Sequence, residues 1–137
     1  MKQLPPLFDE RPFWLQLVGA IVVPLVFGIL TGFALGTQAV VFWVMAGPIA
    51  IIGGFLAGME HATADDGFLR GIIGGLVFGS FTLIGLEILN QEPETYLAEP
   101  QVGFVFATTI LGALEGALGG HYRMRLERRH EGAAARG

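Results

Sequence analysis

Four long apolar segments, each of about 20 residues, occupy most of this 137-residue chain. They cover residues 15–36, 39–58, 68–89 and 102–120, and short connections separate them. At a rise of about 1.5 Å per residue, a helix of this length crosses the roughly 30 Å hydrocarbon core of a bilayer. Only 15% of the residues are charged, against about 25% in soluble proteins. We therefore predict an all-α membrane protein with four transmembrane helices.

The positions of the basic residues predict how these helices are oriented. All eight Lys and Arg residues precede the first segment, start the third or follow the fourth, whereas connections 37–38 and 90–101 carry none. Positive charge gathers on the cytoplasmic side of membrane proteins, so we expect both termini in the cytoplasm. The chain then divides into an N-terminal interfacial segment (1–14), a transmembrane domain (15–122) and a basic tail (123–137). Residues 122–131 are predicted to extend the fourth helix and to lie against anionic headgroups, and residues 132–137 to be disordered.

A short motif recurs in the first and third segments. Leu25-Val26-Phe27-Gly28 with Thr31 returns as Leu76-Val77-Phe78-Gly79 with Thr82. Both segments are predicted to cross in the same direction, so the match favours a parallel repeat of a two-helix hairpin. Chance similarity between two glycine-rich apolar helices explains it equally well. The repeat also favours a retained first helix over a signal peptide cleaved after Ala34-Leu35-Gly36.

Small residues recur every four positions in all four segments. This spacing aligns them on one helix face and leaves a stripe without side chains. In lipid, helices associate through close van der Waals packing, which such stripes permit. The stripes therefore predict helix contacts within one bundle, between copies of the chain, or with other membrane subunits. The stripe residues are Gly28, Gly32, Gly36, Ala46, Ala50, Gly54, Gly58, Gly71, Gly75, Gly79, Gly112, Gly116 and Gly120.

Glu115 is the acidic residue that lies deepest within a predicted helix. The standard helical rise places it about 10 Å from the inner boundary and about 20 Å from the outer one. An acid at this depth is costly unless it faces protein or a water-filled cavity. Two interpretations remain open. Glu115 is either a protonated group bonded to a neighbouring helix, through Thr31, Thr82 or Thr108, or part of a path for protons or cations.

Two other charged residues interrupt the helices near their ends. Glu87 lies two residues from the outer end of the third segment, and we regard it as a weaker candidate for a proton or cation site. Arg70 lies two residues from the inner start of the same segment. Its long side chain is predicted to reach the headgroups and to anchor the helix.

Glu60, His61 and His121 lie at the predicted inner ends of the second and fourth helices. Imidazole and carboxylate groups both bind zinc or manganese, so these residues form a candidate metal site. Their spacing is not diagnostic, because adjacent residues on a helix diverge, and solvated interfacial side chains are the favoured interpretation. His61 also titrates near neutral pH.

A glycine-rich pattern runs across the second and third segments, with an acidic loop in its middle. It reads Pro48, Gly53-Gly54, Ala57-Gly58 and then Gly71, Gly75 and Gly79. This pattern resembles that of a broad class of small four-span prokaryotic membrane proteins of unknown function. The resemblance implies the cytoplasmic membrane of a bacterium or archaeon and supplies no activity.

Composition excludes several classes of function. The chain has no cysteine, which removes disulfides, thiolate metal sites and thiol nucleophiles, and its net charge of -4 argues against nucleic-acid binding. Paired acids, a Ser–His pair and a metal motif are missing from the helices, so we expect neither an enzyme nor a cofactor. The leading hypothesis is a lipid-embedded helix-packing protein, either a homo-oligomer or an accessory subunit of a larger membrane complex. The alternative is a small channel or carrier for protons or cations that uses Glu115, in which Pro24 and Pro48 kink the first two helices.

Overall fold

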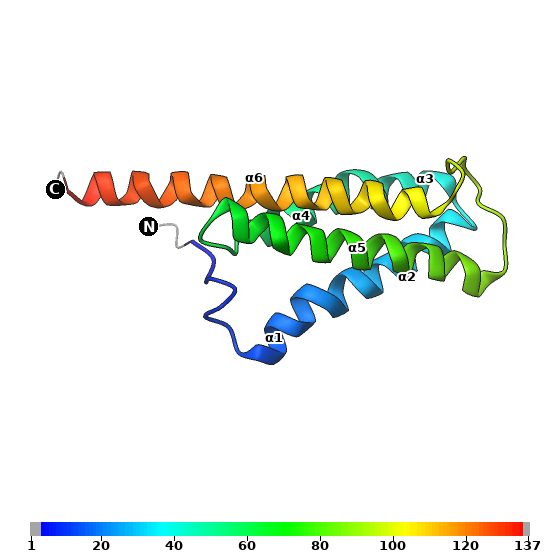
Figure 1. Cartoon of the computed structure of the whole chain (residues 1–137), viewed down its shortest axis with the longest axis horizontal. Helices are drawn as coiled ribbons and strands as arrows, with labels where there is room; N and C mark the ends of the chain where they lie inside the picture. Colours follow the sequence, from blue (N-terminus) through cyan, green and yellow to red (C-terminus); the bar gives the residue numbers. More distant parts are fainter. Residues whose placement is uncertain (1–3, 136–137) are drawn as a thin grey trace.

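The computed structural model describes residues 4–135, and within that range the chain is helical without strands (Figure 1). Lys2 and Arg136, two of the charges behind the predicted orientation, lie outside the described residues. Four helical stretches are long and apolar enough to cross a membrane, which confirms the predicted all-helical class and the number of candidate spans. These first to fourth spans are Phe13–Leu35, Ala39–Gly58, Ala64–Leu89 and Val102–Ala134. The first two form the first hairpin, and the last two form the second.

The second hairpin consists of two uninterrupted helices, α5 (Ala64–Leu89) and α6 (Val102–Ala134). Helix α5 begins earlier than predicted because Thr63 caps it: its hydroxyl oxygen accepts from the Asp66 N–H at 3.1 Å. Helix α6 continues through the basic tail to Ala134, past the predicted end at Glu131, and projects beyond the rest of the bundle (Figure 1).

The first hairpin is built from shorter pieces. The elements of its two spans are α1 (Phe13–Leu17), η1 (Val18–Val22), α2 (Val23–Leu35), α3 (Ala39–Val44), η2 (Met45–Ile49) and α4 (Ala50–Gly58), where η marks a π-helical turn. Pro24 follows η1, and Pro48 lies inside η2 next to Gly47, whose φ of -98° and ψ of -107° are not helical. Proline lacks an N–H and collides with the preceding turn, and the wider π turn accommodates it.

Helices α5 and α6 pack with their backbones in direct contact. A Cβ atom placed on Gly112 would fall 2.5 Å from the carbonyl oxygen of Gly71, and one on Gly116 would collide with Gly67. The Thr108 hydroxyl donates to the carbonyl oxygen of Gly75 at 3.0 Å and links the two helices. The predicted stripes of the third and fourth spans therefore face each other within the chain.

Helix α2 packs on α5 through the recurring motif. The rings of Phe27 and Phe78 stack with centroids 5.5 Å apart. Thr31 and Thr82 are fully buried, and each donates to a carbonyl on its own helix, at 2.7 and 2.8 Å. A Cβ on Gly32 would collide with the backbone of Thr82. Equivalent positions of the motif thus meet at one helix interface.

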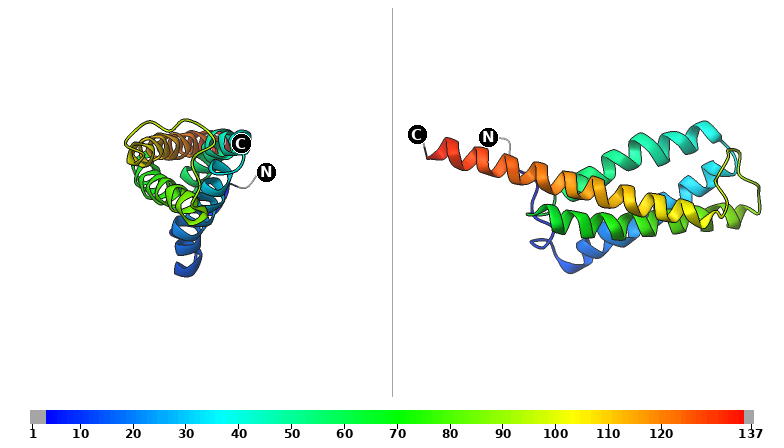
Figure 2. Two further views of the ribbon diagram at one scale, coloured as in Figure 1. Left: turned by 90° about the vertical axis from the view of Figure 1, so that its right-hand side faces the viewer. Right: turned by 45° about the horizontal axis from the view of Figure 1, so that its top comes forward.

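The two spans of the first hairpin diverge toward the end of the bundle where both termini lie, here called the termini end (Figures 1 and 2). They meet only near the opposite end, where α2 contacts α3, while α4 packs on α6 and α5. A buried cluster of Ala34, Leu35, Phe42 and Leu86 closes that opposite end. Connection 91–101 covers it, and the Glu94 N–H donates to the Leu35 carbonyl at 2.8 Å.

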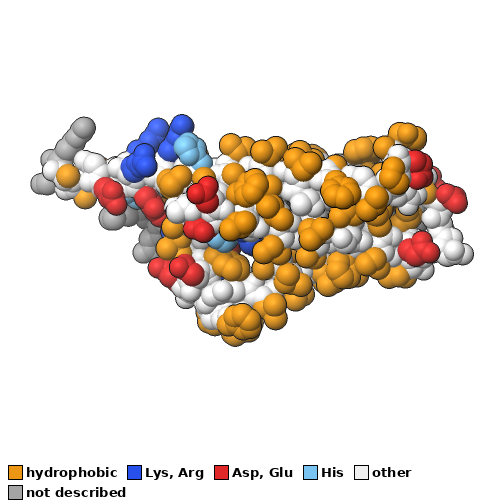
Figure 3. Space-filling view, in the orientation of Figure 1, with side chains coloured by type: hydrophobic (Ala, Val, Ile, Leu, Met, Phe, Trp, Pro, Cys, Tyr) orange, Lys and Arg blue, Asp and Glu red, His pale blue; other side chains and the backbone are white. Residues whose placement is uncertain are grey.

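The outer surface of the bundle is largely apolar. Figure 3 shows one face, where hydrophobic side chains cover the middle of the bundle and charged side chains gather toward its two ends. Large apolar side chains such as Leu30, Ile52 and Leu118 are at least half exposed. Such a surface suits a lipid environment, in which apolar side chains need not be buried by protein.

Candidate functional site

A cavity of about 510 Å³ lies between the diverging spans of the first hairpin; we call it the hairpin cleft. Its volume falls within the roughly 300–1,000 Å³ of typical small-molecule sites. It extends from the termini end to the middle of the bundle, where Phe27, Phe78 and Thr108 line it. Glycines of α5 and α6 form part of its wall. Its charged lining residues are Arg11, Glu60, Arg70 and Glu115.

Glu115 lies half-buried on α6 and faces the bare backbone of α4. A Cβ on Gly54 would fall 3.1 Å from the Glu115 Cβ and 3.2 Å from its carboxyl carbon. Within residues 4–135 the carboxylate takes part in no ion pair. The threonines expected as its partners bond main-chain carbonyls instead, as the Thr108 hydroxyl does with Gly75. The carboxylate is therefore available to whatever enters the cleft.

Arg70 does not follow the expectation that it reaches outward to headgroups. One of its terminal nitrogens donates to the carbonyl oxygen of Gly19 in η1. The other, Nη1, lies 2.9 Å from where a Cβ on Gly74 would stand, one turn further into the bundle. The side chain thus turns inward because Gly74 leaves room for it and η1 presents a carbonyl. It brings a cation into the hairpin cleft.

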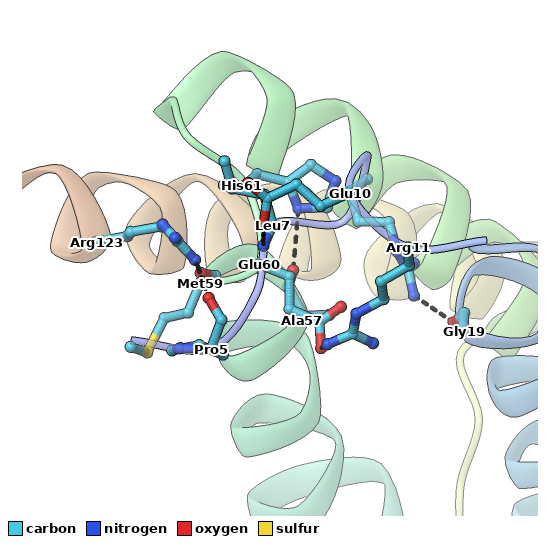
Figure 4. Close-up of polar contacts among 11 residues, drawn as sticks. Pro5, Leu7, Glu10, Arg11, Gly19, Ala57, Met59, Glu60, His61 and Arg123 are labelled. Atoms are coloured by element: carbon cyan, nitrogen blue, oxygen red, sulfur yellow. Dashed lines mark hydrogen bonds and ion pairs between the residues drawn. The ribbon is translucent and has the colours of Figure 1, made fainter. Parts of the chain in front are cut away.

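Residues 4–12, the N-terminal strap, cross the termini end of the bundle (Figure 4). The Phe8 N–H donates to the Glu60 carbonyl at 2.7 Å, and Arg11 pairs with the Glu60 carboxylate at 2.9 Å. The Arg70 guanidinium lies 5.9 Å from the centroid of the Phe8 ring. The strap therefore binds both the connection after α4 and the charged groups at the entrance of the cleft.

Arg123 ties the strap to α6. Its Nη1 donates to the carbonyl oxygens of Pro5, at 2.7 Å, and Met59, at 3.0 Å (Figure 4). Its Nε pairs with Glu127 at 2.7 Å. Arg123 is only 6% exposed, although it begins the tail that was expected to lie against headgroups. It connects three segments that are far apart in the sequence.

His61 packs under the strap. Its ring stacks on Phe8 with centroids 5.0 Å apart, and its Nδ1 lies 3.1 Å from the Ala57 carbonyl oxygen. Burial lowers the pKa of His61 below its usual value of 6.5, and nearby Arg70 acts in the same direction. The Ala57 hydrogen bond and the carboxylates of Glu60 and Asp66 oppose this shift. The imidazole is therefore mainly neutral at pH 7.

The other predicted site residues lie apart from the cleft or in other pairings. Glu87 is exposed at the far end of α5, and His121 is exposed on α6. Among the described residues, no three His, Asp or Glu side chains form a group that could hold a metal ion. Glu60 pairs with Arg11 and His61 stacks on Phe8, so the structure does not bring the candidate metal ligands together.

Sequence reasoning missed Arg11 and Arg70 as parts of the site. One available signal was Gly74, which stands four residues after Arg70 and outside the Gly71–Gly75–Gly79 stripe. A glycine without a packing helix opposite it can mark the space that a neighbouring long side chain occupies. No comparable signal in the sequence distinguishes Arg11.

Comparisons with protein-family models, with curated proteins and with solved structures gave no match to this chain. The resemblance to small prokaryotic four-span proteins therefore stays a prediction from the glycine pattern.

Proposed function

We propose that the chain is a multi-pass membrane protein with cytoplasmic termini that carries protons or cations by way of Glu115. The observation that supports this best is a half-buried carboxylate, free of ion pairs within residues 4–135, on the wall of the hairpin cleft. An ionisable group at such a depth is expensive to keep in lipid and is typical of proton and ion pathways. A cleft that water can enter removes part of that cost.

The shape of the first hairpin supports a carrier more than an open pore. Leu35, Phe42 and Leu86 close the end opposite the termini, so the aqueous route to Glu115 leads from the termini end of the bundle. Transport then requires the first hairpin to close at the termini end and to open at the other. The π turns beside Pro24 and Pro48 are the irregular points at which the first two spans can bend.

The test is flux into liposomes that contain the purified protein and a trapped pH-sensitive dye. Glu115→Gln keeps the size of the side chain and removes its titration, so it should lower proton flux at least tenfold. Glu87→Gln, an exposed carboxylate away from the cleft, is the matched control and should retain wild-type flux. Repeating the assay with imposed Na⁺ or K⁺ gradients separates protons from other cations. Equal flux in wild-type and Glu115→Gln liposomes would overturn the proposal.

Two adjacent glycines provide a test of how Glu115 is positioned. Gly54→Ala places a methyl group against the Glu115 carboxyl and should displace it, whereas a Cβ on Gly53 has no atom within 4 Å. We expect Gly54→Ala to lower flux and to shift its pH profile, and Gly53→Ala to leave both unchanged. Identical pH profiles for the two variants would argue against a role for the Glu115 position.

A second candidate function, assembly as a homo-oligomer or accessory subunit, is favoured by a different observation. A Cβ on Gly47 would have no atom within 4 Å, and Gly47 does not line the hairpin cleft, so this part of the second span offers bare backbone to another helix. Native mass spectrometry of gently solubilised protein tests it, because Gly47→Leu should dissociate an assembly that uses this surface. The Phe27 and Phe78 rings stack, and the two residues occupy equivalent positions of the recurring motif. This contact also supports the proposal that the two hairpins arose by duplication.

A further inference from the structure

Arg70 brings a positive charge into the hairpin cleft. Arg70 has no carboxylate partner within the described residues, because the nearby Glu60 is paired with Arg11. Within residues 4–135, the Arg70 Nε is buried without a hydrogen-bond partner, and the Gly19 carbonyl is the only acceptor to which the Arg70 guanidinium donates. A guanidinium has five N–H donors, and leaving it partly desolvated without an anion is costly. The cleft therefore has an unfilled preference for an anion at Arg70.

The shape of the cleft indicates what kind of anion this is. Gly71 packs on Gly112, which places Arg70 at the height of the inner part of α6. From there the cleft continues toward the middle of the bundle between Val23, Phe27 and Ile49. Leu111 and Phe78 line it as well. A free phosphate or carboxylate would leave this apolar part empty, whereas an anion that carries a hydrocarbon chain would fill it.

The surroundings of the cleft indicate where such a molecule comes from. Val23, Ile49 and Leu56 line the cleft and are also 57%, 47% and 54% exposed. The cleft thus borders the apolar outer surface of the first hairpin, which faces lipid in the proposed membrane orientation. A lipid molecule can enter sideways between the diverging spans without leaving the bilayer.

We infer that the hairpin cleft binds one anionic membrane lipid, with its phosphate group on Arg70 and a single acyl chain between α2 and α4. Arginine forms short, charge-assisted hydrogen bonds with phosphate and so accounts for headgroup selection. The apolar walls account for the chain. This inference goes beyond the proposed transport function, because lipid binding at Arg70 holds whether or not Glu115 carries a proton.

The test uses palmitoyl lysophosphatidic acid, which has one chain and a phosphate headgroup, added to the full-length protein in a neutral detergent. Native mass spectrometry should show one bound lipid, at least tenfold tighter than palmitoyl lysophosphatidylcholine, whose headgroup carries a compensating positive charge. Arg70→Gln should weaken the binding about tenfold or more and abolish the preference between headgroups.

A second variant keeps the test decisive if Arg70→Gln does not fold. Gly53→Leu fills the cleft without a backbone clash and should also prevent binding, while Gly103→Leu, equally free of neighbours but outside the cleft, should bind normally. Glu115→Gln should abolish flux yet retain lipid binding, which separates this inference from the transport proposal. Unchanged binding by Gly53→Leu, or equal affinity for the two lipids, would overturn the inference. Displacement of the lipid by millimolar inorganic phosphate would show that the site takes a soluble anion instead.

Discussion

The two hairpins contain similar stripes of small residues yet pack in different ways. In the second hairpin the stripes of α5 and α6 face each other, and backbone meets backbone from Gly67 against Gly116 to Gly75 against Thr108. In the first hairpin, Gly28 and Gly32 face α5 instead of the second span. The second span turns the part of its stripe near the termini end toward α6, where a Cβ on Gly58 would collide with Gly116.

Both hairpins contain stripes, so a stripe alone does not make two consecutive helices pack together. What decides this is which helix the stripe contacts. Lipid provides little hydrophobic drive between helices, so two spans join only where both offer close contact. The first and second spans both direct their glycines at the second hairpin. They consequently have no shared surface near the termini end, and the cleft is the space that remains.

The largest expected effect comes from breaking the second hairpin. Gly116→Leu would drive a side chain into the backbone of Gly67, and overpacking of this kind should cost about 3 kcal/mol. Gly53→Leu in the first hairpin has no atom within 4 Å of the added Cβ and should leave stability nearly unchanged. Thermal denaturation in detergent measures both. Equal losses of thermal stability in the two variants would mean that the two hairpins do not differ in packing.

A smaller effect is expected from releasing the strap, which connects the open end of the first hairpin to α6. Arg123→Ala removes the bonds to the Pro5 and Met59 carbonyls and should cost about 2 kcal/mol. Arg125→Ala, an exposed neighbour on the same helix, should change stability by less than about 0.5 kcal/mol. Hydrogen exchange of the Phe8 amide should accelerate in the first variant alone. Protection of that amide in Arg123→Ala would show that the strap is held by other contacts.

The smallest effect is a pH dependence of the strap. Burial lowers the pKa of His61 in the folded protein, so His61 binds a proton more readily once the strap is released. The contribution of His61 to strap packing is therefore complete above pH 6.5 and is lost as the pH falls through its lowered pKa. Exchange of the Phe8 amide, corrected for its intrinsic pH dependence, should accelerate in that window and should lose this acceleration in His61→Gln. If exchange of the Phe8 amide in the wild-type protein does not accelerate in that pH window, His61 does not contribute to strap packing in this way.

The sequence predicted the helices well because their signal is local. Length and apolarity suffice to locate four spans, and the observed Ala39–Gly58 matches the predicted 39–58. Glu115 was also recognisable, since its depth follows from counting residues along one helix. Pro24 and Pro48 correctly marked irregular backbone, although their π turns are not encoded in any simple pattern.

The cleft was not predictable because it depends on which stripes meet. Spacing shows that Gly32 and Gly116 lie on bare helix faces, but it contains no information on the partner helix. The inward turn of Arg70 has the same origin, since it requires the Gly19 carbonyl of another span. The separation of the candidate metal ligands has a related origin: Arg11 pairs with Glu60 across segments that are distant in the sequence.

The first hairpin is open at the termini end and the second is closed along its length, and paired spin labels measure this difference directly. Leu17 with Leu56 in the first hairpin, and Leu69 with Leu118 in the second, are about half exposed or more and should accept labels without disturbing the packing. The chain has no native cysteine to interfere with labelling. Double electron–electron resonance in lipid bilayers should give a longer and broader distance distribution for the first pair of labels than for the second. Equal distances, or a shorter one for Leu17 with Leu56, would contradict the account.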